Sequence, residues 1–214
     1  CFQEQNYQPA RPSGSAPIAR SSLNFLQGKR FQQIWCVDFE FGRSSNLTPE
    51  LRCMVAREYY SGRLERLWLD GVAKPACPFP LGENSLCIAY YASAEMGCHL
   101  AFDWDLPNSL LDLFCEFRCQ TNGLPLPAGN GLLGALTAYG LAHISFVEKA
   151  EMIQLALRGG PDSAEEQVAL LDYCQTDVDA LVALLPEMAP KIPIDHALIR
   201  GHYMKAVARM QFVG

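Results

Sequence analysis

The pattern of apolar and polar residues divides the chain into an extended first half and a helical second half. Short runs rich in aromatic and β-branched residues, bounded by turn-forming residues, predict strands. Five such runs cover residues 33–41, 52–60, 63–69, 86–91 and 110–114. Ser61-Gly62, between the second and third runs, predicts a hairpin turn. A helix-like pattern fills residues 92–104, between the fourth and fifth runs.

Beyond Gly123 the apolar residues recur with helical spacing. Helices are predicted at about 131–140, 146–158, 163–186 and 195–211. Ser163, with Glu166 three residues later, forms a capping box at the start of the longest helix. Strands that pair first as a meander and then alternate with helices indicate a mixed sheet flanked by helices, an α/β fold.

The remaining features of composition restrict the class of protein. Residues 1–29, rich in Gln, Pro, Ser, Gly and Arg, predict a flexible leader. A net charge of −6 argues against binding nucleic acid through bulk charge alone, although bound divalent cations reverse the field locally. The nine cysteines have no zinc-knuckle spacing, and several lie in apolar runs, which favours reduced thiols in a cytoplasmic protein. No apolar stretch reaches membrane-spanning length, so no membrane partner is expected.

Two carboxylates lie two residues apart in the first predicted strand. Asp38 and Glu40 point to one face of this strand, while Val37 and Phe39 point to the other. The run contains no Lys or Arg to neutralise the two acids. Because carboxylate oxygen is the ligand that Mg²⁺ and Mn²⁺ prefer, the pair indicates a metal site if further acids converge on it.

A second pair of polar residues lies on the longest predicted helix. Tyr173 and Asp177 are four residues apart and therefore share a face of the helix. An apolar stripe beside them would seat the helix on the sheet. Its members are Leu170, Cys174, Val178, Leu181 and Leu185.

Together these residues resemble the DEDD, or DnaQ-like, superfamily of 3′→5′ exonucleases. Asp38 and Glu40 match its first motif, D-x-E, and Tyr173 and Asp177 match the third motif of its tyrosine subclass. The likeness covers about residues 31–190. It implies a ribonuclease H-like fold, in which an antiparallel meander precedes parallel strands in a five-stranded sheet.

The second motif of the superfamily is altered in this chain. Where the family has Asn followed by an aromatic residue and Asp, Tyr91 stands in the Asn place, Ala94 replaces the aromatic residue, and Glu95 is the acid. Asp112, on the next strand, is similar to an acid often seen there in the family. Either acid could complete the set, and Glu95 is preferred because it occupies the topological place of the motif.

The end of the chain carries a second, shorter resemblance. Residues 198–210 look like the helix that opens the polymerase part of family A DNA polymerases, and the chain stops at the Gly that follows such a helix. The resemblance implies an exonuclease domain at residues 30–190 and the truncated start of a polymerase-like region at 191–214. The partner would then be a polymerase domain in the same longer chain.

The resemblance implies that the chain hydrolyses terminal phosphodiesters of single-stranded DNA with two Mg²⁺ or Mn²⁺ ions, as the proofreading domain of a DNA polymerase. Asp38 would bridge both ions, Glu40 and Asp177 would complete one, and Glu95 would hold the other. Tyr173 would orient the attacking water.

Three aromatic residues are candidates for contact with the substrate. Tyr91 and Phe41 could stack on the terminal bases of a single strand. Phe39 points to the opposite face of its strand, so only its backbone is expected to approach the substrate. Two alternatives remain: an RNA-trimming exonuclease of the same fold, or a structural or docking module in which the altered second motif has weakened catalysis.

Overall fold

The structure is a computed structural model, and it describes residues 31–43, 49–71, 74–141 and 163–213. The predicted leader at residues 1–29 and the predicted helix at 146–158 lie outside the described residues.

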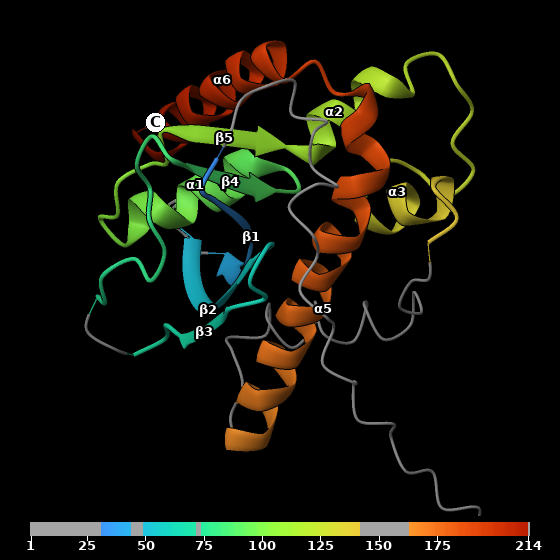
Figure 1. Cartoon of the computed structure of the whole chain (residues 1–214). Coiled ribbons are helices and arrows are strands. Elements are labelled where there is room, and N and C mark those ends of the chain that lie inside the picture. The colour runs from blue at the N-terminus through green and yellow to red at the C-terminus, as the bar shows by residue number, and fades with distance from the viewer. Residues whose placement is uncertain (1–30, 44–48, 72–73, 142–162, 214) are drawn as a thin grey trace, which may run out of the picture.

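A single five-stranded sheet forms the centre of the described structure (Figure 1). Its strands are β1 (Gln33–Arg43), β2 (Pro49–Glu58), β3 (Leu64–Trp68), β4 (Ser85–Ala89) and β5 (Ser109–Asp112). The strand order is β3-β2-β1-β4-β5. The first three strands pair antiparallel, whereas β4 lies parallel to both β1 and β5. This is the predicted ribonuclease H-like α/β fold, with its antiparallel meander followed by parallel strands.

The central strand β1 extends beyond its parallel neighbour. Its ladder with β4 ends where Cys36 lies opposite Ile88. Asp38 is two residues further along β1, level with the point at which the chain leaves β4 and enters helix α1. The acids of β1 therefore lie at the carboxyl ends of the parallel strands. Ligands of open α/β sheets commonly bind at this end of the sheet.

Helices cover both faces of the sheet (Figure 1). They are α1 (Ala92–Ala101), α2 (Leu113–Gln120), α3 (Leu132–Ala138), α5 (Ala164–Met188) and α6 (Ile194–Val213), with a short 3₁₀ turn, η2 (Ala189–Lys191), between the last two. Ser163 caps α5, because its hydroxyl accepts a hydrogen bond from the Glu166 N–H at 3.2 Å, as the capping box predicts.

The alternation of side chains along β1 divides the core in two. Ile34 and Cys36 pack with α2, α3 and α5 on one face of the sheet. Trp35, Val37 and Phe39 pack with α1 on the other face. Because the period is two residues, Asp38 and Glu40 belong to the face that α5 covers.

The fifth strand ends earlier than its sequence predicts. The apolar run at residues 110–114 predicts one strand, but β5 ends at Asp112 and helix α2 begins at Leu113. The Asp112 carboxylate accepts hydrogen bonds from the N–H groups of Phe114 and Cys115, which caps the helix. A short apolar run does not by itself distinguish a strand from the buried start of a helix.

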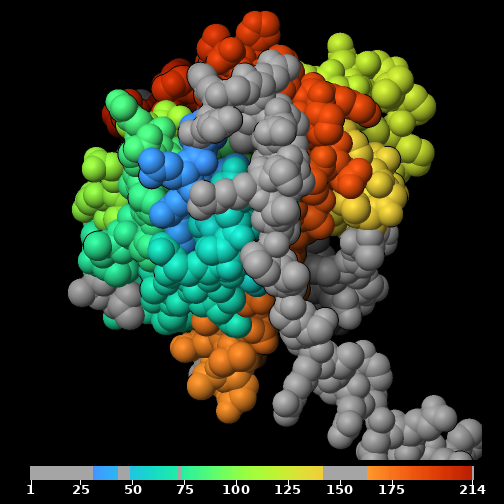
Figure 2. All heavy atoms as spheres, in the orientation of Figure 1, coloured from blue at the N-terminus to red at the C-terminus, as the bar shows by residue number. Residues whose placement is uncertain are grey.

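Helix α6 packs closely against the edge strand β5. A Cβ atom placed on Gly201 would lie 1.9 Å from the carbonyl oxygen of Leu110, so only Gly permits this approach. The assignment of residues 191–214 to a polymerase-like region stays a prediction. In Figures 1 and 2 the first turns of α5 extend beyond the rest of the described structure. Among the described helices, none combines the length and the apolar character that crossing a membrane requires.

Candidate metal centre

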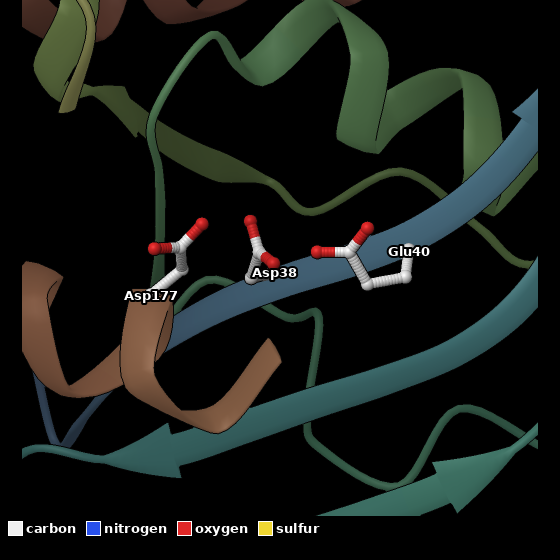
Figure 3. Close-up of side chains that lie close together, drawn as sticks. All are labelled: Asp38, Glu40 and Asp177. Carbon is white, nitrogen blue, oxygen red and sulfur yellow. The ribbon is translucent and has the colours of Figure 1, made fainter. Parts of the chain in front are cut away.

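Three carboxylates converge where β1 and α5 meet. Asp38 and Glu40 reach from β1 and Asp177 reaches from α5, and their side chains point into a common space (Figure 3). Each residue offers an oxygen atom, and these oxygens all lie within 4.8 Å of one another. Asp177 is distant in sequence from Asp38 and Glu40 but adjacent to them in the fold, as the two motifs predict.

The polypeptide places these carboxylates through two periodicities. Residues two apart on β1 share the face that α5 covers, which brings Asp38 and Glu40 together. On α5, buried Leu170, Cys174 and Val178 anchor the helix in the core. Asp177, beside this stripe, is consequently held at the boundary between core and solvent.

Tyr173 lies with the carboxylates, one helical turn before Asp177. Its side chain is buried, with 7% of its surface exposed. Burial, together with the charges of Asp177, Glu40 and Asp38, raises the pKa of the Tyr173 phenol. The hydroxyl therefore stays protonated at neutral pH and can donate a hydrogen bond, but it is a poor general base.

Cys174 forms a hydrogen bond with Asp38. Its thiol donates to the Asp38 carboxylate, with 3.4 Å between Sγ and Oδ2, and lies 3.3 Å from the Asp38 main-chain oxygen. Burial is the main reason that the pKa of the Cys174 thiol is raised well above its ordinary value. A neutral thiol is a hydrogen-bond donor, so Cys174 restrains the orientation of Asp38.

Glu95 approaches the same centre from helix α1 on the other face. Only 5% of its surface is exposed, and within the described structure its Oε2 atom has no hydrogen-bond partner. Burial raises the pKa of Glu95 well above its usual range, and the charges of Asp38 and Glu40 raise it further. A buried carboxylate oxygen without a hydrogen-bond partner, beside two other acids, is an arrangement that a bound cation would neutralise.

Asp112 has a different environment from Glu95. Its two carboxylate oxygens accept hydrogen bonds from the N–H groups of Tyr91 and Ala92 at 3.1 Å each. Oδ1 also accepts hydrogen bonds from the N–H groups of Phe114 and Cys115 at the start of α2. Asp112 thus joins the start of α1 to the start of α2. These hydrogen bonds occupy its oxygens, which leaves Glu95 as the acid better placed to complete a metal site.

The aromatic candidates lie in three different environments. The Phe39 side chain is buried on the face opposite the carboxylates, so only its main chain is near them. Phe41 is half-buried and packs against that same opposite-face cluster. Tyr91 is 49% exposed at the start of α1. Contact of these residues with substrate stays a prediction.

One contact of the centre is not evident from the sequence, whereas His99 is the packing histidine that its place on the helix indicates. In the sequence, Cys174 is one residue of an apolar stripe. Its thiol contacts Asp38 only because α5 packs against β1. His99, one turn after Glu95, is fully buried among Phe39, Phe79 and Trp104. Its Nδ1 atom lies 3.0 Å from the carbonyl oxygen of Asp105.

Comparison with known proteins identifies similar folds. No family model matches the chain, and no curated protein matches it in sequence. The catalytic core of RRP6 from Trypanosoma brucei is similar in structure, with a TM-score of 0.57 and 15% identity, over 91% of this chain and 48% of that one. Escherichia coli RNase D, an exoribonuclease involved in structured RNA processing, has a TM-score of 0.55 and 15% identity, over 88% and 47%.

A DNA polymerase is among the similar structures as well. The family B DNA polymerase of the hyperthermophilic archaeon Pyrobaculum calidifontis gives a TM-score of 0.51 and 13% identity, over 82% of this chain and 27% of that one. The chain therefore spans about half or less of the length of these neighbours. At such low identity the likeness establishes the fold, and the activity must be argued from the site.

The donor set fits a hard divalent cation. All the candidate ligands are carboxylates, which suit Mg²⁺ or Mn²⁺ better than softer metals. Two observations favour a cation here: three carboxylate oxygens within 4.8 Å of one another, and the unpartnered buried oxygen of Glu95 beside them.

Proposed function

We propose that the chain is a metal-dependent 3′→5′ exonuclease that removes nucleotides from the 3′ end of single-stranded DNA. The observation that carries this proposal is the convergence of Asp38, Glu40 and Asp177, with their oxygens within 4.8 Å of one another. Tyr173 on the same helix as Asp177 supports assignment to the tyrosine subclass. The ribonuclease H-like fold is the scaffold that such a site requires.

Each residue of the centre has a distinct task in this proposal. Asp38, Glu40, Asp177 and Glu95 would hold two Mg²⁺ or Mn²⁺ ions, with Asp38 shared between them. Bound ions would supply positive charge at the scissile phosphate and lower the pKa of a coordinated water. The protonated hydroxyl of Tyr173 would orient the attacking water by a hydrogen bond, and Cys174 would keep Asp38 in place.

The substrate of this exonuclease could be DNA or RNA. Proofreading DNA at the 3′ end would follow from the resemblance of residues 198–210 to the opening helix of family A polymerases. RNA trimming is the second candidate, because Escherichia coli RNase D, which has a similar fold, is an exoribonuclease. The two substrates differ at the 2′ position, so contacts with the 2′-hydroxyl would discriminate between them.

The deciding experiment incubates the protein with strands labelled at the 5′ end, one of DNA and one of RNA, in Mg²⁺, in Mn²⁺ and in EDTA. We expect a ladder of products shortened from the 3′ end, formed only with a divalent cation. Asp38→Ala should abolish this activity while circular dichroism shows an unchanged fold. Asp172→Ala is the matched control, since Asp172 lies on the same helix as Asp177 but pairs with Arg66 at the surface.

The outcomes separate the alternatives. Faster degradation of DNA supports the DNA exonuclease, and faster degradation of RNA supports the trimming enzyme. If neither strand is shortened in either metal, the domain is a structural or docking module. Equal activity of Asp38→Ala and the parent protein would show that the carboxylate centre is not responsible.

A further inference from the structure

A cluster of two aromatic rings and one arginine lies at the same sheet edge as the carboxylates. Tyr91 is the N-cap residue of α1, after β4, and Phe114 lies in the first turn of α2, after the parallel neighbour β5. Their ring centroids are 5.1 Å apart with nearly perpendicular planes. The guanidinium carbon of Arg118 lies 5.8 Å from the centroid of the Phe114 ring. We name these three residues the aromatic platform.

The backbone of Tyr91 is unusual for an exposed aromatic residue. Its φ of 70° and ψ of 53° lie in the left-handed region, which residues other than Gly and Asn rarely adopt. The Asp112 carboxylate holds the Tyr91 N–H at 3.1 Å, which fixes this conformation. Such strained residues concentrate at binding sites. Tyr91 is 49% exposed and lies one helical turn before Glu95.

Arg118 adds an available positive charge to the rings. It is exposed, and its guanidinium lies over the Phe114 ring. Glu116, the acid on the same helix, is bound by Arg200 at 2.7 Å. An exposed guanidinium and the exposed residue Tyr91, which both contact the Phe114 ring, suit a ligand that combines a planar base with a phosphate.

We propose that the aromatic platform binds a nucleotide of the single-stranded substrate upstream of the one that is hydrolysed. Tyr91 stacks on its base, Phe114 supports the Tyr91 ring, and Arg118 pairs with a flanking phosphate. This inference rests on the proposed function, which it extends from the cleaved nucleotide to its neighbour. The shared chemistry is that of a single-stranded nucleotide, in either DNA or RNA.

The test measures binding separately from hydrolysis. Fluorescence anisotropy in Mg²⁺ would use two eight-nucleotide probes, oligo-dT and oligo-U. Their last linkage carries a methylene group in place of the bridging 3′ oxygen, so they cannot be cleaved there. Tyr91→Asn removes the ring but tolerates the left-handed backbone, and Tyr91→Phe restores the ring. Exposed residues of α6 provide matched controls in Tyr203→Asn and Arg209→Ala.

Stacking and charge have different signatures. We expect Tyr91→Asn to raise Kd roughly 5- to 100-fold without changing its salt dependence. Arg118→Ala should reduce the slope of log K against log salt concentration by about 0.7, the value for one phosphate contact on a single strand, and Arg118→Lys should restore it. With a cleavable strand, both variants should raise KM while kcat changes little.

The results distinguish the platform from the proposed function. If the parent protein digests strands but Tyr91→Asn and Arg118→Ala bind as tightly as the α6 controls, the platform is wrong and the exonuclease stands. If the parent protein digests nothing but its binding still depends on Tyr91 and Arg118, the platform stands and the exonuclease is wrong. Absence of binding by the parent protein overturns the platform.

Discussion

The carboxylate of Asp112 accepts a hydrogen bond from the backbone N–H of Ala92, with 3.1 Å between Oδ2 and N. This contact fastens the first residue of α1 to the last residue of β5. Helix α1 carries Glu95, whose buried carboxylate lies near Asp38 and Glu40. Asp112 therefore controls the position of the fourth acid of the candidate centre, although its own oxygens are occupied by backbone donors.

The first prediction separates the two acids by their response to metal. Glu95→Gln should weaken metal affinity and activity strongly, because it removes a negative charge from the cation site. Asp112→Asn should reduce stability by about 1–2 kcal/mol, the typical cost of losing a helix cap, while leaving metal affinity less affected. The measurements are metal titrations of exonuclease rate and chemical denaturation for both variants. A collapsed titration for Asp112→Asn with a normal one for Glu95→Gln would reverse the assignment.

The second prediction concerns the hydroxyl of Tyr173. Tyr173→Phe keeps the buried ring but removes the hydrogen bond that would orient water. We expect the rate to fall roughly 10- to 100-fold, equivalent to about 1.4–2.7 kcal/mol of barrier. Metal affinity should be preserved, and isothermal titration with Mn²⁺ measures it independently. An unchanged rate would assign Tyr173 a packing role.

The third prediction tests the support that Cys174 gives to Asp38. Cys174→Ala removes the thiol donor and should raise the Mg²⁺ concentration needed for half-maximal rate several-fold, as expected for a hydrogen bond worth about 0.5–1.5 kcal/mol. Cys174→Ser retains a donor and should recover most of the loss. Ala180, a half-buried residue of the same helix packed at the edge of this core, offers a control in Ala180→Ser. Identical metal titrations for both Cys174 variants and the parent would refute this role.

The fourth prediction is a pH dependence of stability caused by His99. Burial lowers the pKa of His99 from 6.5 to about 4, so the folded protein keeps the ring neutral. Between these values the unfolded chain binds more protons than the folded one, and the free energy of unfolding should therefore fall as the pH falls from 6.5 to 4. The full effect is about 3 kcal/mol.

The control for this effect is a variant without a titratable ring. His99→Phe should flatten the acid limb of the stability curve, measured by urea denaturation at several pH values. The dependence of the free energy of unfolding on pH should be unchanged in His196→Phe, since His196 is exposed on α6. If the loss of stability at acid pH is unchanged in His99→Phe, carboxylates are its cause instead.

Much of the architecture is determined locally and could be predicted from the sequence. Alternating and helical periodicities located all five strands and the helices that position Asp38, Glu40, Tyr173 and Asp177. Spacing of two on a strand and four on a helix placed each pair on one face. These relations depend only on backbone geometry, so they hold in any fold that forms those elements.

Only the tertiary structure decided the relations between distant elements. That Cys174 donates to Asp38, that Asp112 caps two helices, and that His99 is enclosed by aromatic rings all depend on packing across the sheet. The sequence left Glu95 and Asp112 as alternatives, with Glu95 preferred, because the second motif is altered and each acid resembles one that the family carries. Their oxygens differ in which backbone N–H groups surround them, and that is fixed by the packing of β4, β5 and α1, not by local spacing.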